Sequence, residues 1–372
     1  MQTSTLTPHT LRLGSGVLNF PTFLPDATFG YVRGLDAGDL ENLGIDGLVM
    51  NSFHLMQTPG SAVVGALGGL HKMAGWRRPI VTDSGGFQAY SLIRQNPKAG
   101  SISKAGITYY PEGFSRKISL TPEKSIQLQM AYGSDVLICL DDCTDSSASY
   151  QEESESVDRT IQWARRAKQA YLRLVAERNL SDEERPRLFA VVQGGEFRDL
   201  RRACAEALLE LGFDGFGFGG WPLDEAGALL TDTLGYVREL IPPQFPLHAL
   251  GIGHPEAVVL AHTLGYQIFD SALPTRDARH GRLYQFREDP SNPVGPSSSP
   301  WFDTLFIQDE RHMRSDEPIS PYCDALCCSR YSVGYLHHLF KMGDPLYIRL
   351  ATLHNLRFMV NLCNQLEQRD QG

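Results

Sequence analysis

The sequence contains neither a long apolar run nor a segment typical of a secretion signal. No uninterrupted apolar stretch among its 372 residues approaches the roughly 18 to 20 residues that a membrane-spanning helix needs. The N-terminal stretch MQTSTLTPHTLRLGSG lacks the charged and then apolar pattern of a signal peptide. We therefore expect a cytoplasmic protein that makes no contact with a membrane.

The chain also lacks an excess of positive charge and an even number of cysteines. Its net charge of -9 argues against a general nucleic-acid coat, because sequence-independent affinity requires Lys and Arg to neutralise phosphates. One local basic patch is present, with four arginines against one acid between Arg276 and Arg287. The seven cysteines argue against a disulfide framework, which leaves metal binding, catalysis or burial as their roles.

Short apolar runs that each end in a polar residue or glycine alternate with helical patterns. The eight runs are residues 22–26, 47–51, 79–83, 136–141, 188–193, 215–219, 247–251 and 267–270. The clearest helical patterns are residues 36–43, 122–132, 150–177, 197–211, 224–240 and 255–264. Such alternation indicates a parallel sheet buried on both faces, and eight strands predict an α/β fold of the (β/α)₈ or TIM barrel type.

The remaining segments predict additions to this barrel. Residues 10–23 alternate like a hairpin, and residues 91–121 and 144–155 form long connections, the first of which either closes over a ligand or decorates the surface. The alternation stops after residue 282, and residues 289–299, rich in Pro and Ser, predict a loop. We expect residues 1–282 to form the barrel core with its hairpin. Residues 283–372 should form a loop and a mostly helical, cysteine-bearing subdomain packed on it.

Polar residues and glycines follow the predicted strands, where the active site of a TIM barrel lies. They are Asn51, Asp83, Asp141, Asp142, Gln193, Gly219, Gly220, Gly251 and Asp270. Hydrogen-bonding groups and glycines that converge on one mouth describe a pocket for a flat polar ligand.

Asp270 is followed by three basic side chains, Arg276, Arg279 and His280. A carboxylate at a strand end beside a cationic loop suggests chemistry on an anion. Alternatively, Asp270 caps a turn before Pro274 and the arginines form a solvated surface.

Two further motifs fit a purine-like ligand. Around Asp83, paired glycines leave room for a ring and Phe87 offers a stacking face, although the motif is also a good turn. Asp141 and Asp142 suit the N–H donors of the Watson–Crick edge of guanine, and Gln193 can donate to its carbonyl oxygen. Helix capping would explain one of these two acids.

The motif GFGFGG, residues 215–220, formally matches the dinucleotide fingerprint. Its glycines occupy a predicted strand, however, and Trp221 and Pro222 follow where the phosphate-binding helix should begin. We interpret these glycines as room for a ligand close to the backbone.

The cysteines Cys323, Cys327 and Cys328 are followed by the histidines His337, His338 and His354. A zinc site needs four sulfur or nitrogen ligands, which these residues can supply. The alternative is a set of buried thiols and helix-face histidines.

On these motifs the chain resembles the tRNA-guanine transglycosylases, the enzymes of queuosine and archaeosine tRNA modification. The matching stretches are NSFHL (51–55), LGGLHKMAGWRRPIVTDSGGFQ (67–88), LDDCT (140–144), VVQGG (191–195), FDGFGFGG (213–220) and FDSALPTRDARHG (269–281). The resemblance covers nearly the whole chain and implies a TIM barrel with a zinc-containing helical subdomain. It also implies action on a tRNA anticodon loop and a homodimer.

The resemblance implies a pentosyltransferase that exchanges the wobble guanine of tRNA for a 7-deazaguanine, queuine or its aminomethyl precursor, with retention. Asp270 would be the nucleophile that forms a ribosyl ester, and Asp83 the general acid and base. The implied base-binding residues are Asn51, Phe87, Asp141, Asp142, Gln193, Gly219, Gly220, Trp221 and Leu250. Arg276 and Arg279 would contact the tRNA backbone.

The chain departs from the family pattern at two places. The family zinc motif is Cys-x-Cys-x2-Cys with a later histidine, but its middle position is Ala325 here, so we expect Cys323, Cys327, Cys328 and His354 as the ligands. Trp221 stands where the family has a small aliphatic segment near the 7-substituent, and Leu250 where methionine is common. Bulk at this wall should change which 7-deazaguanine fits.

Two other functions are compatible with the sequence. The first is a related enzyme that inserts deazapurines into DNA. The second is a non-catalytic partner subunit that binds tRNA or base. Retention of both Asp83 and Asp270 argues against the second, because a scaffold does not need two carboxylates at one mouth.

Overall fold

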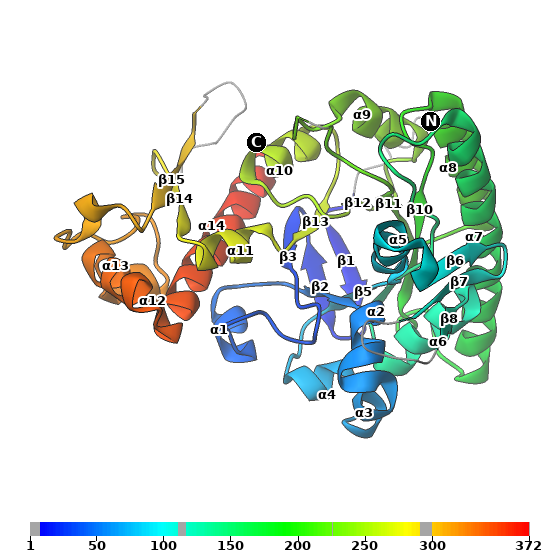
Figure 1. Ribbon diagram of the computed structural model, residues 1–372, viewed down its shortest axis with the longest axis horizontal. Helices are drawn as coiled ribbons and strands as arrows, with labels where there is room; N and C mark the ends of the chain where they lie inside the picture. Colours follow the sequence, from blue (N-terminus) through cyan, green and yellow to red (C-terminus); the bar gives the residue numbers. More distant parts are fainter. Residues whose placement is uncertain (1–7, 111–116, 225, 291–299, 372) are drawn as a thin grey trace.

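The computed structural model describes residues 8–110, 117–224, 226–290 and 300–371, with a closed parallel sheet at the centre (Figure 1). Its strands are β3 (Thr22–Pro25), β4 (Leu48–Asn51), β5 (Ile80–Asp83), β9 (Val136–Ile138), β10 (Arg187–Val192), β11 (Gly215–Phe218), β12 (Leu247–Ala249) and β13 (Ile268–Ser271). They pair in the order β3-β13-β12-β11-β10-β9-β5-β4, and a parallel bridge between Asp26 and Val49 joins the two ends. All eight predicted strands and the predicted barrel are confirmed.

Helices cover the outside of this sheet or lie in the connections that follow its strands. They are α1 (Ala37–Asn42), α2 (Ser52–Leu55), α3 (Ser61–Ala66), α4 (Leu70–Ala74), α5 (Gly86–Gln95), α6 (Pro122–Tyr132), α7 (Tyr150–Glu177), α8 (Arg198–Leu211), α9 (Thr231–Leu240), α10 (Pro255–Thr263) and α11 (Leu273–Arg279), with short helical turns η1 (Met56–Gly60) and η2 (Pro97–Ala99). The bounds of α6 and α7 are as predicted. Thr121 caps α6, and α7 begins with a capping box in which Ser149 and Glu152 satisfy each other's backbone amides.

The prediction of a helix over residues 224–240 is wrong in its first half, because α9 begins only at Thr231. The Asp224 carboxylate accepts hydrogen bonds from the amides of Ala226 and Ala228, which folds the segment into a turn. Asp readily forms such local bonds, and they compete with helix formation.

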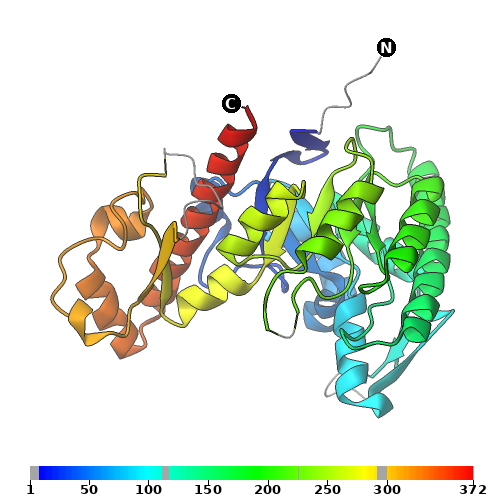
Figure 2. The ribbon, with the colours of Figure 1, turned by 90° about the horizontal axis from the view of Figure 1, so that it is seen from above.

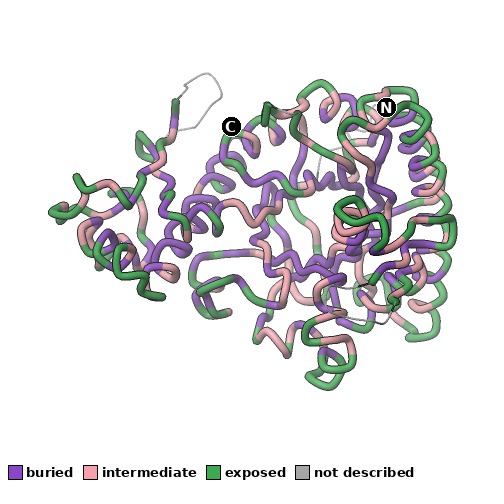
Figure 3. Tube along the Cα trace, in the orientation of Figure 1, coloured by how far each residue is buried: buried purple, intermediate pink, exposed green. Residues whose placement is uncertain are grey.

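The core has two layers. Apolar side chains on one face of the strands pack against the helices, and those on the other face fill the barrel. The antiparallel hairpin of β1 (Thr10–Leu13) and β2 (Gly16–Asn19) confirms the predicted hairpin and inserts Leu18 into the barrel interior. Figure 3 shows that buried residues concentrate on the central strands. Burial of a Leu side chain such as Leu18 contributes about 1.5–3 kcal/mol to stability. The hairpin closes the end of the barrel opposite the mouth.

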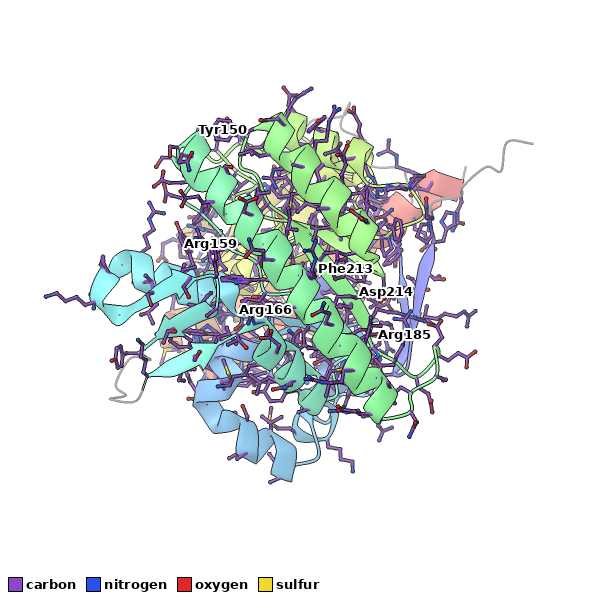
Figure 4. All side chains as sticks on the ribbon, turned by 90° about the vertical axis from the view of Figure 1, so that its right-hand side faces the viewer. Tyr150, Arg159, Arg166, Arg185, Phe213 and Asp214 are labelled. Carbon is purple, nitrogen blue, oxygen red and sulfur yellow. The ribbon has the colours of Figure 1, made fainter. Side chains whose placement is uncertain are left out.

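The long connection predicted over residues 91–121 has secondary structure of its own, and its residues 111–116 lie outside the described part of the chain. The connection contains the end of α5 and a sheet of β6 (Gly100–Ser103), β7 (Gly106–Tyr109) and β8 (Ile118–Leu120). Arg166 of α7, labelled in Figure 4, donates from Nη1 to the carbonyl of Lys104 at 2.7 Å and from Nε to Glu123 at 2.6 Å. The bond to Lys104, between β6 and β7, ties the sheet to α7, and the bond to Glu123 ties α7 to α6.

The C-terminal part contains β14 (Arg282–Phe286), β15 (Phe302–Phe306), η3 (Glu310–His312), α12 (Leu326–Arg330), α13 (Val333–Met342) and α14 (Pro345–Gln371). The expectation of mostly helical sequence missed β15, which pairs antiparallel with β14. Residues 291–299 of the predicted loop lie outside the described residues. Figures 1 and 2 show α14 between the barrel and the other C-terminal elements, and it contacts α11, α10 and β3. The division at residue 282 stays a prediction.

Among the residues that the structure describes, no helix is both long enough and apolar enough to cross a membrane.

Candidate active site

Four carboxylates lie at the barrel mouth, where the strands end. Asp83 closes β5, Asp270 lies on β13, Asp141 follows β9 and Asp26 follows β3. Asp26 is absent from the residues predicted for the pocket, although it ends a predicted strand as the others do. Its Oδ1 accepts a hydrogen bond from the Thr28 hydroxyl. Burial raises the pKa of Asp26, and the negative charge of Asp270 raises it further.

Asp83 is held by its neighbour on β4. Asn51, its partner in the strand register, donates from Nδ2 to Asp83 Oδ2 at 2.8 Å and accepts from the amide of Phe53 at 2.9 Å. Gly85 has a φ of 84°, and a Cβ there would lie 2.6 Å from Cβ of Phe53, so only glycine fits this turn. Burial raises the pKa of Asp83 to about 6, with a further contribution from Asp270. The carboxyl is therefore able to gain and lose a proton near neutral pH.

Asp270 receives two hydrogen bonds on the same oxygen. Nε2 of His248 lies 2.8 Å from Asp270 Oδ1, and the amide of Gly251 donates to Oδ1 at 3.0 Å. The Asp270 side chain is 16% exposed, so the carboxylate remains accessible from the mouth. His248 was not predicted as a site residue; the available signal was a histidine inside an otherwise apolar strand.

Asp141 and Gln193 form a paired edge of the pocket. Gln193 donates from Nε2 to Asp141 Oδ2 at 2.6 Å, while its buried Oε1 has no partner among the described residues. Burial raises the pKa of Asp141 to about 7, and Asp83 and Asp142 add to that shift. A Cβ on Gly219 would lie 2.7 Å from Cδ of Gln193, so the glycine permits this approach.

The buried guanidinium of Arg201 was also not predicted, although it organises the same edge. It donates from Nε to the carbonyl of Gly195 at 2.8 Å and from Nη1 to that of Gly219 at 3.0 Å. Burial lowers the pKa of Arg201. These bonds fix the backbone on both sides of Gln193, together with the paired glycines Gly219 and Gly220.

Two aromatic rings border the pocket. The ring centroids of Phe87 and Trp221 are 5.4 Å apart in an edge-to-face arrangement, and both side chains are partly exposed. Trp221 donates from Nε1 to the carbonyl of Thr144 at 3.1 Å. Leu250 packs at the top of the barrel interior, where a Cβ on Gly217 would lie 2.9 Å from its Cδ1.

The side chain of Asp142 pairs with α7 and not with these residues. Its buried carboxylate accepts from Nε of Arg159 on α7 at 2.6 Å, and its amide donates to Thr160 Oγ1 at 3.0 Å. Arg159 is labelled in Figure 4. The structure thus uses Asp142 to attach α7, and its predicted contact with a base stays a prediction.

The two predicted tRNA-binding arginines lie in the last turn of α11. No carboxylate in the described residues forms an ion pair with Arg276 or Arg279. Burial lowers the pKa of Arg279, as does the nearby Arg33. Two unpaired cations beside a catalytic mouth are suited to phosphate contacts.

A second cluster lies in the C-terminal part. The ligand atoms of Cys323, Cys327, Cys328 and His354 all lie within 4.8 Å of one another, so this cluster can hold a metal ion. His354 Nε2 lies 2.6 Å from the carbonyl of Tyr284, which fixes the proton on Nε2 and leaves the Nδ1 lone pair facing Cys328 Sγ at 3.3 Å. Hydrogen bonds from Cys323 and Cys327 lower the pKa of Cys328.

The other two histidines considered for metal binding are not members of this group. His337 is buried, and its Nδ1 lies 2.7 Å from the carbonyl of Ile307.

Comparison with known proteins gives a full-length match. The family model described as "Queuine tRNA-ribosyltransferase" matches residues 9–369. The queuine tRNA-ribosyltransferase of Syntrophobacter fumaroxidans is 36% identical over 352 residues, covering 95% of this chain and 87% of the relative. That of Psychrobacter sp. is 34% identical over 353 residues, covering 95% and 86%. The protein of the same name from Halothermothrix orenii is 33% identical over 362 residues, covering 97% and 87%.

Proposed function

Since the chain belongs to the queuine tRNA-ribosyltransferase family, we propose that its barrel mouth exchanges the wobble guanine of tRNA for a 7-deazaguanine. The enzyme is a tRNA-guanine transglycosylase, a pentosyltransferase. The observation that carries the assignment of its residues is the placement of Asp83 and Asp270 at one mouth, close enough for the charge of Asp270 to raise the pKa of Asp83.

In the first half of the reaction, Asp270 attacks C1′ of the target nucleotide through its free oxygen. The bond from C1′ to N9 of guanine breaks, and guanine leaves with the electron pair. Asp83 supplies the proton that the leaving guanine takes up. A pKa of about 6 suits this role, because a general acid works best with a pKa near the working pH. The product is a ribosyl ester of Asp270, and the phosphodiester backbone stays intact.

In the second half, the incoming 7-deazaguanine loses its N9 proton to Asp83 and attacks the same carbon. The ester bond breaks and Asp270 leaves as a carboxylate. Two inversions at one carbon give net retention, as in retaining glycosidases. The exchange consumes neither ATP nor a redox equivalent, since one glycosidic bond replaces another.

The base is recognised by groups at the opposite side of the mouth. Asp141 accepts from the N–H donors of the Watson–Crick edge, and the Gln193 amide bonds the base carbonyl. Gly219 and Gly220 let the ring lie against the backbone, and Phe87 stacks on it.

Other residues orient Asp83, shape the pocket wall and bind the tRNA. Asn51 orients Asp83, while Trp221 and Leu250 shape the wall near the 7-substituent. Arg276 and Arg279 bind phosphates of the anticodon loop, whose target base must leave its stack to reach the mouth.

Zinc is the metal that best suits the Cys323, Cys327, Cys328 and His354 cluster, because three sulfurs and one imidazole are typical of a structural zinc site. Such an ion would tie α12 to α14 and, through the carbonyl of Tyr284, to β14. Cys327 here does the work of the cysteine replaced by Ala325. Cys327→Ser should lower bound zinc in metal analysis; full occupancy would mean that another group completes the site.

We further propose a homodimer that works in the cytoplasm. Large apolar side chains are exposed on the C-terminal part, among them Met313, Tyr322, Tyr335 and Met342, and a partner chain could cover them. Light scattering should give twice the chain mass for the wild type. Tyr335→Lys should shift the mass toward that of one chain.

Incorporation of labelled guanine into unmodified tRNA by the purified chain tests the proposal. Label in tRNA with the wild-type anticodon, and none in anticodon-mutated tRNA or duplex DNA, is the expected result. Label in DNA would instead indicate the DNA-acting alternative. No label with folded, metal-loaded protein would favour the partner-subunit alternative. Competition by queuine and its aminomethyl precursor then identifies the natural incoming base.

A further inference from the structure

The cluster of side chains that fills the barrel interior is apolar. On β13, Ile268 belongs to the interior cluster, and alternation along the strand places Asp270 on the same face. On β12, Leu247 and Ala249 pack toward the helices, so His248 between them faces the interior. His248 is therefore an imidazole buried in an apolar layer, with 1% of its side chain exposed.

A buried polar group in such a layer is costly unless it is hydrogen-bonded. The described residues offer His248 a single partner, Asp270 Oδ1, at 2.8 Å from Nε2, and its Nδ1 has none. The tautomer with the proton on Nε2 is the one whose hydrogen meets an acceptor. The imidazole is thus committed to one oxygen of one carboxylate.

That oxygen is also the acceptor for the Gly251 amide, at 3.0 Å. Two donors from different positions on and after β12 therefore hold Oδ1 and leave Oδ2 without a protein partner in the described residues. A carboxylate fixed in this way can turn neither about its Cβ–Cγ bond nor away from the mouth. The free oxygen then points in one direction, as orientation of a nucleophile requires.

We propose that His248 is a positioning residue for Asp270, which selects Oδ2 as the oxygen that bonds to C1′. This inference rests on the proposed role of Asp270 as nucleophile. As the C1′–Oδ2 bond forms, the C1′–N9 bond breaks and its electron pair leaves with guanine. Oδ1 becomes the ester carbonyl and keeps both hydrogen bonds. When the second base displaces the ester, the same donors stabilise the departing carboxylate.

Three substitutions separate positioning from packing. His248→Phe keeps a ring of similar size and removes the donor. His248→Gln places an amide nitrogen near the position of Nε2, whereas His248→Asn places it near the unpartnered Nδ1. Gln and Asn thus form a matched pair in which only one can reach Asp270. Each variant is assayed as the full chain for exchange of labelled guanine into tRNA, with tRNA binding and thermal unfolding measured alongside.

The expected result is a fall in kcat of about 10- to 100-fold for the Phe and Asn variants with KM for tRNA changed by less than about two-fold. The Gln variant should recover most of kcat. Equal activity of the Gln and Asn variants would overturn the proposal, as would a rise in KM with unchanged kcat.

Asp270→Asn shows whether a negative result contradicts the positioning role of His248 or the proposed function on which it rests. If Asp270→Asn still forms a covalent RNA adduct, the nucleophile assignment fails. If Asp270→Asn is inactive and all three His248 variants keep wild-type kcat, the proposed function stands and the positioning role fails.

Discussion

The two ends of the barrel use aspartate for opposite purposes. At the closed end, Asp214 receives two bonds from Arg185, at 2.8 and 2.9 Å, and one from the amide of Leu188 at 2.8 Å. Arg185 and Asp214 are labelled in Figure 4. Asp135 at the same end accepts from the amide of Ile80 at 2.8 Å and pairs with His71 at 3.1 Å. Both carboxylates there have a basic partner, Arg185 or His71, and a strand amide.

At the mouth, no Lys or Arg of the described residues pairs with Asp83, Asp141 or Asp270. Their partners are amides and an imidazole, and burial raises the pKa of Asp83 to about 6 and of Asp141 to about 7. The contrast teaches that carboxylates at the strand starts have basic partners, while those at the strand ends are left unneutralised, as the proposed chemistry requires. Such sites commonly cost stability in exchange for activity.

The largest loss of activity is expected for Asp270→Asn at the mouth. An amide cannot form the ribosyl ester, so exchange should fall by about ten-thousand-fold or more while tRNA binding stays near normal. The measurement is a denaturant-resistant enzyme–RNA adduct together with label exchange. Asp214→Asn is the matched control, and the folded fraction of that variant should retain wild-type exchange. An adduct in Asp270→Asn would remove the distinction between the two ends.

Asp83→Asn should lower exchange by about 100- to 1,000-fold, since it removes one general acid and base. In the free enzyme Asp83 must carry a proton, so kcat/KM for tRNA should fall as pH rises above about 6. Esterification of Asp270 removes a charge that raises the pKa of Asp83, so Asp83 is more readily ionised in the intermediate and is available as the base for the second half. Accordingly, kcat/KM for the base should fall only toward lower pH.

The pH profiles of the two substrates, measured separately, check this prediction. Parallel profiles for tRNA and base would contradict a single residue that acts first as acid and then as base. A dependence with a midpoint near pH 7 that remains in Asp83→Asn would be assigned to Asp141, whose pKa is raised by burial to about 7.

Stability should change in opposite directions at the two ends. Asp214→Asn should lower the free energy of unfolding by about 2 kcal/mol, because it breaks charge-assisted bonds. Asp141→Asn should raise it by about 1 kcal/mol at neutral pH. The pKa of Asp141 is raised in the folded state, so the folded state binds the extra proton and stability falls as pH rises from about 4 to about 7. Urea unfolding measures both; equal destabilisation would refute the contrast.

The strands and the polar residues at their ends were easier to predict from the sequence than the contacts that hold those residues. Eight apolar runs and their polar ends predicted the barrel and placed Asp83, Asp141 and Asp270 together, because parallel strands end at one edge. The two site residues that the sequence did not predict, Arg201 and His248, act through tertiary contacts. Arg201 donates to the carbonyls of Val192 on β10 and Gly219 after β11. His248 looks in the sequence like one more strand residue, and only the fold brings it to Asp270.

The side-chain direction of Asp142 was not predictable either. Adjacent acids after a strand point to opposite sides, and only packing of α7 shows that Arg159 takes one of them. Strand β15 was missed for a similar reason, since five residues gain their stability from pairing with β14.

Trp221→Leu tests whether the indole at the rim of the pocket lies near the 7-substituent of the base. Removing the indole deletes its contact with Phe87 and its bond to the carbonyl of Thr144. Preference among guanine, queuine and the aminomethyl precursor should shift by about tenfold, the scale typical of a wall that changes in size. Competition assays measure this shift. An unchanged preference would place the 7-substituent elsewhere.

The smallest effect is expected at His71, whose protonation makes the stability of the closed end depend on pH. Its Nδ1 lies 3.0 Å from the carbonyl of Trp76 and its Nε2 3.1 Å from Asp135, so the doubly protonated ring can donate to both. Burial lowers the pKa of His71, but the bond to Asp135 and its charge outweigh this, and the pKa is raised overall. The imidazolium therefore stabilises the fold fully below about pH 6.5, and this contribution is lost as pH rises through the raised pKa.

His71→Gln should accordingly cost about 0.5–1 kcal/mol at about pH 6 and less at about pH 9, measured by urea unfolding of both proteins. The mouth titrates in a lower window, between about 4 and 7, and should do so identically in both proteins. A difference between wild type and His71→Gln that stays constant with pH would mean that His71 contributes through packing alone. The closed end would then owe its stability to the pairing of Asp214 and to the strand amides.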